Sequence, residues 1–135
     1  MTLETDELTN LDVDTVALAR AASFAADAKD GEAIEVLDVS GVQVMCDVFV
    51  LVSGRTERQV KAIADEVEAV VRERTGRTPQ SVEGRDSLRW VLLDYGDVIV
   101  HVFEDSLRDF YDLDSLWADA PRVPVAPPVR QPSVV

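Results

Sequence analysis

The chain has 135 residues, of which 47% are hydrophobic, and this predicts one globular domain that buries its own core. Its 26 acidic and 13 basic residues give a formal net charge of −13 at pH 7. Phosphate backbones repel such a surface, so the charge argues against a broad nucleic-acid-binding face and favours a basic protein partner. The single cysteine, Cys46, excludes an internal disulfide and favours a reducing compartment. No apolar run approaches the ~18 residues of a membrane helix, so we expect a cytoplasmic protein.

The two ends of the chain differ in composition from its body. Residues 1–14 hold five acids and no base, which predicts a mobile acidic leader. Residues 121–135 hold five prolines, which predict a disordered or polyproline tail. The domain that we place over residues 15–120 keeps 21 acids and 11 bases, so the acidity belongs mainly to the folded part.

Within this domain, predicted helices and strands alternate. The alanine-rich residues 15–28 predict a first helix. Thr56 with Gln59 forms a capping box that starts a second helix, and Gly76 ends it. Ser106 is expected to cap a last helical stretch. Strands are expected over residues 34–39, 44–52, 81–84, 90–93 and 98–103. This order predicts an α/β (α+β) fold, a mixed sheet of about five strands with helices packed on it.

The last two strands flank the junction Asp94-Tyr95-Gly96-Asp97, which has the composition of a hairpin turn. A two-residue loop would place the two aspartates opposite each other, where like charges destabilise the pair. A three-residue loop with a glycine bulge would shift the register by one residue, and tyrosine's poor fit to positive φ favours this version. The carboxylates either attract a cation from a partner or serve as turn residues bonded to local backbone.

Other candidate residues point to structure or to binding more than to catalysis. Trp90 starts a strand beside the charged turn, so it is either a core residue or an interface anchor. His101, the only histidine, lies between valines and is read as a structural residue. Asp112-x-Asp114 can hold magnesium, but its helical setting favours capping and surface roles. Ser53-Gly54 lacks the pattern of a phosphate-binding loop. We predict no catalytic, cofactor or metal site.

Several short motifs, in order and spacing, resemble those of one known family. They are Asp47-Val48-Phe49, Ser53-Gly54, Arg58-Gln59-Val60, Val82-Glu83-Gly84, Trp90 through Asp97, His101-Val102-Phe103, Tyr111, Leu113, Leu116 and Trp117. Residues 15–119 thereby resemble the ribosomal silencing factor family, also called the Iojap-like family. The resemblance implies a fold similar to that of nucleotidyltransferases, and homodimers in the free state.

The resemblance also implies a function, which is translational repression under nutrient limitation. Members bind the large ribosomal subunit through its fourteenth ribosomal protein and obstruct joining of the small subunit. An acidic domain fits a basic ribosomal protein. The expected docking residues are Glu83, Trp90, Leu92, Asp94, Tyr95 and Asp97. A role in large-subunit assembly is the alternative, and a nucleotidyltransferase-like enzyme is a distant one, because no strand carries the Asp-x-Asp of that chemistry.

Overall fold

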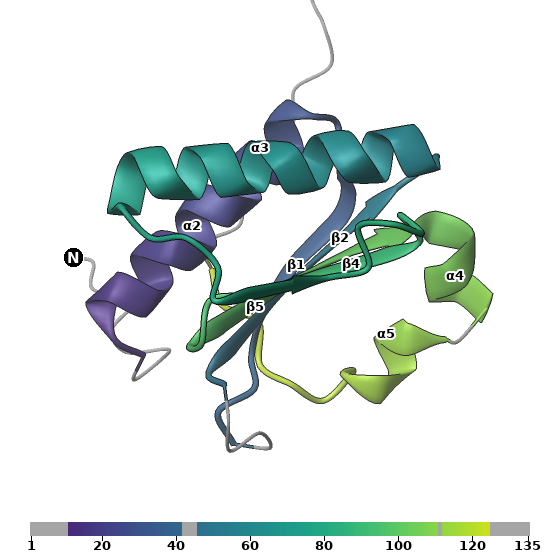
Figure 1. The fold of residues 1–135 in the computed structure, drawn as a ribbon. Coiled ribbons are helices and arrows are strands. Elements are labelled where there is room, and N and C mark those ends of the chain that lie inside the picture. The colour runs from purple at the N-terminus through teal and green to yellow at the C-terminus, as the bar shows by residue number, and fades with distance from the viewer. Residues whose placement is uncertain (1–10, 42–45, 111, 125–135) are drawn as a thin grey trace, which may run out of the picture.

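The computed structural model describes residues 11–41, 46–110 and 112–124, and Figure 1 shows their arrangement. Two long helices, α2 (Val13–Ala28) and α3 (Glu57–Thr75), accompany five strands and two short helices. The strands are β1 (Glu32–Asp38), β2 (Val48–Gly54), β3 (Ser81–Glu83), β4 (Trp90–Asp94) and β5 (Val98–Glu104). The short helices are α4 (Asp105–Phe110) and α5 (Leu113–Leu116).

The strands form one mixed sheet in the order β1-β2-β5-β4-β3. β2 and β5 are parallel, and the other neighbours are antiparallel. Helices α2 and α3 pack on each other and cover one face of the sheet, whereas α4 and α5 lie on the opposite side (Figure 1). The predicted α+β fold with a mixed five-stranded sheet is therefore confirmed. Its kinship to nucleotidyltransferases stays a prediction.

The ends of α3 follow from its sequence. The Thr56 hydroxyl accepts a hydrogen bond from the Gln59 amide at 3.1 Å, which satisfies one of the free N–H groups at the helix start. The Gln59 side chain accepts from the amide of Arg55, one residue before the cap. Gly76 ends the helix with φ of 78°, in the left-handed region that glycine tolerates. The predicted capping box and the predicted end of the helix are both confirmed.

The sheet separates two groups of buried side chains. Alternate residues of the central strands, such as Val50 and Val100, face α2 and α3 in the larger core. The residues between them, such as Phe49 and Phe103, belong to a smaller core on the other face. β2, a nearly continuous apolar run, is buried along its whole length, because neighbours cover both of its faces. Cys46 is 4% exposed, and burial raises the pKa of its thiol to about 11.

The last helical stretch differs from the prediction. It is divided into α4 and α5, and Ser106 lies inside α4 and does not cap it. The carboxylate of Glu104 accepts hydrogen bonds from the amide and the hydroxyl of Ser106, so glutamate does the capping. Asp112 follows with φ of 51°, a left-handed conformation that interrupts the helix. Tyr111 lies outside the described residues.

The packed part of the chain extends slightly beyond the predicted domain at both ends. Helix α2 begins at Val13, inside the segment assigned to the leader. At the other end, Pro121 and Val123 hydrogen-bond to the backbone of β1, and Val123 is 4% exposed. Residues 1–10 and 125–135 lie outside the described residues, so an acidic leader and a proline-rich tail remain predictions for them.

Candidate docking surface

The turn between β4 and β5 has a register that differs from both predicted versions. Asp94 pairs with Ile99, and the Tyr95 amide donates to the Val98 carbonyl at 2.8 Å, so the loop consists of Gly96 and Asp97. Gly96 has φ of 94°, which suits the first central position of a type II′ turn. The two aspartates therefore do not face each other. Asp94 accepts a hydrogen bond from the amide of Gly96 at 2.8 Å, which fixes the turn locally.

Asp97 is held by other parts of the same chain. Arg77, which follows α3, places Nη2 2.7 Å from Asp97 Oδ1 and Nη1 3.2 Å from Oδ2. The Thr15 hydroxyl of α2 donates to Oδ2 at 2.6 Å. Burial opposes ionisation, but the hydrogen bonds from Arg77 and Thr15 outweigh it and hold the pKa of Asp97 below its usual value. This carboxylate is thus engaged within the fold.

Tyr95 also points away from the expected surface. It is 4% exposed and belongs to the core under α2 and α3. Its hydroxyl is buried, and it has no hydrogen-bond partner among residues 11–41, 46–110 and 112–124. Burial, assisted by the charge of Glu68, raises its pKa to about 12. Tyr95 and Asp97 therefore lie apart from the other expected docking residues.

The remaining four expected residues share the face of the sheet opposite α2 and α3. Trp90, Leu92 and Asp94 alternate with the buried core residues of β4. Glu83 of the edge strand β3 lies directly opposite Leu92. Glu83 is exposed and the other three are half-buried. We call these four residues the β4 patch: Trp90, Leu92 and Asp94 in one row along β4, with Glu83 beside Leu92.

A buried histidine of β5, His101, contacts the β4 patch from the neighbouring strand. Trp90 Nε1 donates a hydrogen bond to His101 Nδ1 at 3.1 Å, and His101 lies opposite Leu92 in the register of β4 and β5. The ring of Trp90 also packs on Phe103, with 5.0 Å between centroids. Burial lowers the pKa of His101 to about 4, so the ring is neutral near pH 7. The alternation of β5 places His101 on the face of Trp90, but nothing in the sequence alone pairs their nitrogens.

Helix α4 is fixed to the same side of the sheet by a buried arginine. Arg108 is 4% exposed, and its Nη1 donates to the Ser53 hydroxyl at 2.9 Å and to the Ala33 carbonyl at 3.1 Å. Each of the two short helices ends in an exposed apolar side chain: Phe110 of α4 is 77% exposed, and Leu116 of α5 is 68% exposed. Exposed large apolar side chains are frequent at protein interfaces.

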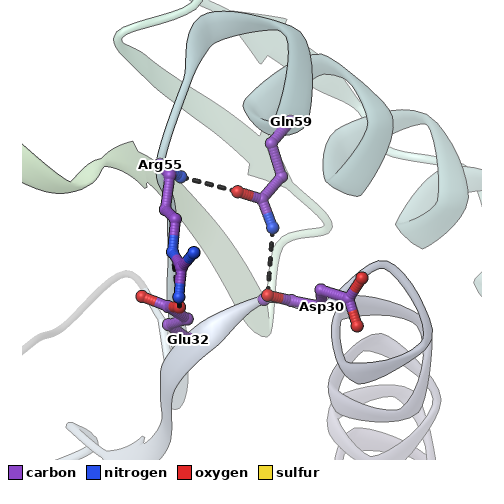
Figure 2. A pocket seen from close by; sticks show the side chains of 5 residues that line it. Asp30, Glu32, Arg55 and Gln59 are labelled. Atoms are coloured by element: carbon purple, nitrogen blue, oxygen red, sulfur yellow. Dashed lines mark hydrogen bonds and ion pairs between the residues drawn. The ribbon is translucent and has the colours of Figure 1, made fainter.

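The turn from β2 to α3, whose sequence lacks the phosphate-binding pattern, lines a polar pocket. Figure 2 shows its pocket, where Arg55 lies against Glu32, with 2.6 Å between Nη2 and Oε2. Gln59 bridges the Arg55 amide and the Asp30 carbonyl (Figure 2). The polar groups of this pocket thus bind one another, and a Cβ on Gly54 would come within 3.2 Å of Val60. The start of α3 therefore packs closely against Gly54, and a side chain there would force Val60 to shift.

The part of the chain that the structure describes contains no group of three or more His, Cys, Asp or Glu residues that could hold a metal ion. None of its helices is both long and apolar enough to cross a membrane.

Comparisons with known proteins agree on one family. The family model described as "Ribosomal silencing factor during starvation" matches residues 12–134. The ribosomal silencing factor of Bacillus subtilis is 43% identical over 100 residues, which cover 74% of this chain and 84% of that protein. The chloroplastic protein Iojap of Arabidopsis thaliana is 28% identical over 102 residues, covering 76% of this chain and 42% of that one.

Two solved structures of similar sequence share the fold. A crystal structure of a protein from Chromobacterium violaceum superposes with a TM-score of 0.72 at 31% identity, covering 91% of this chain and 92% of the other. One from Bacillus halodurans gives a TM-score of 0.67 at 39% identity, covering 78% and 95%. The predicted resemblance is confirmed, and this chain belongs to the ribosomal silencing factor family.

Proposed function

We propose that this protein represses translation by binding the large ribosomal subunit and obstructing its association with the small subunit. The partner would be a basic protein of the large subunit, the fourteenth in the ribosomal numbering. The action would take place in the cytoplasm under nutrient limitation. Membership of the family supports a ribosomal role, because the family model and the bacterial relatives are named for ribosomal silencing.

The observation that carries the proposal is the β4 patch. Trp90 and Leu92 offer half-buried apolar surface that a partner can cover, and Glu83 and Asp94 flank them with negative charge. Tryptophan is frequent among residues that dominate binding energy, and flanking charges of one sign select a partner of the opposite sign. The net charge of −13 would speed encounter with a basic protein and disfavour contact with ribosomal RNA.

A steric blocker needs no chemistry of its own. We therefore propose that the protein acts without catalysis and without a cofactor. From its resemblance to the family we also propose that it forms a homodimer when free. The enzyme alternative has a direct test, which is magnesium-dependent nucleotide binding measured by calorimetry. Heat from saturable binding would favour the enzyme, and its absence would favour the blocker.

Co-sedimentation with purified ribosomal subunits tests the proposed function. The protein should pellet with large subunits and should lower the yield of joined ribosomes when small subunits are added. Binding without any effect on joining would favour the assembly role. Absence from the large-subunit fraction at low salt would overturn the ribosomal proposal.

Two substitutions test the patch in the same assay. Trp90→Ala should weaken binding by at least ~30-fold, as expected for a central interface residue. Asp94→Asn should weaken it less. Glu73→Gln is the matched control, because Glu73 is exposed on α3 and the substitution removes one negative charge far from the patch. Equal losses for Asp94→Asn and Glu73→Gln would show that overall charge matters and the patch does not.

A further inference from the structure

The histidine beneath the β4 patch has an unusual hydrogen-bond state. His101 is 5% exposed, and its Nδ1 accepts from the indole N–H of Trp90 at 3.1 Å. An indole N–H only donates, so Nδ1 must carry the lone pair and Nε2 must carry the proton of the neutral ring. Nε2 is buried and has no hydrogen-bond partner among the described residues of the chain. The ring therefore satisfies Trp90 and leaves its own N–H unsatisfied.

Packing alone does not explain a histidine at this position. The ring contacts Phe49 edge-on at 4.6 Å between centroids and stacks parallel to Phe103 at 5.9 Å. In such a setting an apolar ring would avoid the cost of a buried, unpaired N–H group. What histidine adds, and phenylalanine lacks, is the acceptor nitrogen that faces Trp90.

The Nδ1 acceptor of His101 restricts the orientation of the Trp90 side chain. Trp90 is the first residue of β4 and is half-buried, so the sheet alone does not restrict its outer edge. The bond to His101 and the contact with Phe103, at 5.0 Å between centroids, fix both the indole nitrogen and the ring plane. A side chain already held in one orientation loses less entropy on binding, which is worth about 2- to 12-fold in affinity.

We propose that His101 is a positioning residue for partner binding, which presets the indole of Trp90 through the Nδ1 acceptor. This inference rests on the proposed function, because it assumes that Trp90 contacts the partner. The low pKa of His101 agrees with it, since a neutral ring keeps the acceptor available near pH 7.

Two substitutions separate the acceptor from the ring. His101→Phe keeps the aromatic shape and removes the acceptor. His101→Asn removes the ring but keeps an acceptor, the amide Oδ1, on Cγ, the carbon that carries Nδ1 in histidine. A purely structural role predicts that Phe is the better replacement in both stability and binding. A positioning role predicts opposite orders, with Phe better for stability and Asn better for binding.

The first measurement is the indole N–H resonance of Trp90 in the free, ¹⁵N-labelled protein. A spectrum of Trp90→Phe assigns it against the resonance of Trp117. We expect it to move upfield and to exchange faster with water in His101→Phe, and to stay near its original position in His101→Asn. An unchanged resonance in His101→Phe would overturn the inference.

The second measurement is large-subunit binding by the same variants. His101→Phe should weaken binding about 2- to 12-fold, His101→Asn should restore at least part of the loss, and His101→Phe should add nothing in a Trp90→Phe background. Full affinity in His101→Phe, or weaker binding by Asn than by Phe, would overturn the positioning role. If the unsubstituted protein does not bind the subunit, the proposed function fails, and the resonance alone decides whether His101 fixes Trp90.

Discussion

Arg77 and Asp97 form a two-point ion pair that joins the segment after α3 to the turn between β4 and β5. The distances are 2.7 Å from Nη2 to Oδ1 and 3.2 Å from Nη1 to Oδ2, and Arg77 Nη2 also donates to the Tyr95 carbonyl at 2.8 Å. Thr15 adds a bond from α2 to the same carboxylate. One aspartate thereby connects both long helices to the hairpin that carries the β4 patch.

We predict that Asp97→Asn lowers the free energy of unfolding by about 1–3 kcal/mol, because it weakens the partly buried pair with Arg77. Urea unfolding at pH 7 measures the loss. The pKa of Asp97 is lowered in the fold, so this contribution is present above the ordinary pKa of aspartate and disappears as the pH falls through the folded value. Asp65→Asn is the control, since the ion pairs of Asp65 are more exposed and should contribute ~1 kcal/mol or less.

The same variant tests whether Asp97 takes part in docking. Because its carboxylate is engaged by Arg77 and Thr15, folded Asp97→Asn should bind the large subunit as well as the unsubstituted protein does. A variant that keeps its stability and loses binding would return Asp97 to the docking surface.

Gly84→Ala should destabilise the protein by at least about 2 kcal/mol, because Gly84 has φ of 90° and faces the backbone of Trp90. An added Cβ would lie 2.0 Å from the Trp90 carbonyl oxygen, so the start of β4 would have to move. Thermal and urea unfolding measure the change. Gly41→Ala is the control, because a Cβ there would meet nothing within 4 Å and should change stability by about 0.5 kcal/mol or less. Equal stability of the two variants would contradict the prediction.

The sequence was sufficient for much of the fold because the decisive signals are local. The capping box at Thr56, the glycine at the end of α3 and the alternating apolar residues of β4 each act within a few residues. The hairpin itself was also evident. Its register differs because both predicted versions made Gly96 the last residue of the loop, whereas the structure uses Gly96 as the first turn residue and leaves Tyr95 on the core face.

The partners of the turn could not be predicted, because they lie far away in the chain. Thr15 is 82 residues from Asp97 and Arg77 is 20 residues away, and no local pattern relates them. The bond between Trp90 and His101 depends in the same way on the register of β4 and β5. Once that register is known, one face of the sheet holds four of the expected docking residues, Glu83, Trp90, Leu92 and Asp94. Tyr95 and Asp97 lie toward the opposite face.

The free energy of unfolding should decrease as the pH is lowered from about 6.5 to 4, in part because of His101. Its pKa is lowered to about 4 in the fold, so in this range the unfolded chain binds a proton that the folded chain does not. The contribution is at most on the order of 3 kcal/mol and stops growing below about pH 4, where both states are protonated. Urea unfolding at several pH values measures it.

His101→Phe isolates this contribution, because the carboxylates that titrate in the same range are common to both proteins. The difference in unfolding free energy between the variant and the unsubstituted protein should shift in favour of the variant as the pH falls from 6.5 to 4. A difference that does not change with pH would show that His101 is not kept neutral by burial.

Val123→Asp should release the short segment that covers the free edge of β1. The Val123 amide donates to the Val36 carbonyl at 2.8 Å, and the side chain is buried at 4% exposure, so a carboxylate there should cost about 2–3 kcal/mol. The uncovered edge would present unpaired backbone groups, and self-association should rise above that of the unsubstituted protein in sedimentation velocity. Arg122→Gln is the control, because it removes the half-exposed pair with Glu35, worth ~1 kcal/mol or less, and the bond from Nη1 to the Ala120 carbonyl, and keeps the backbone bonds of the segment. If Val123→Asp matched this control in both measurements, the segment would not protect the edge.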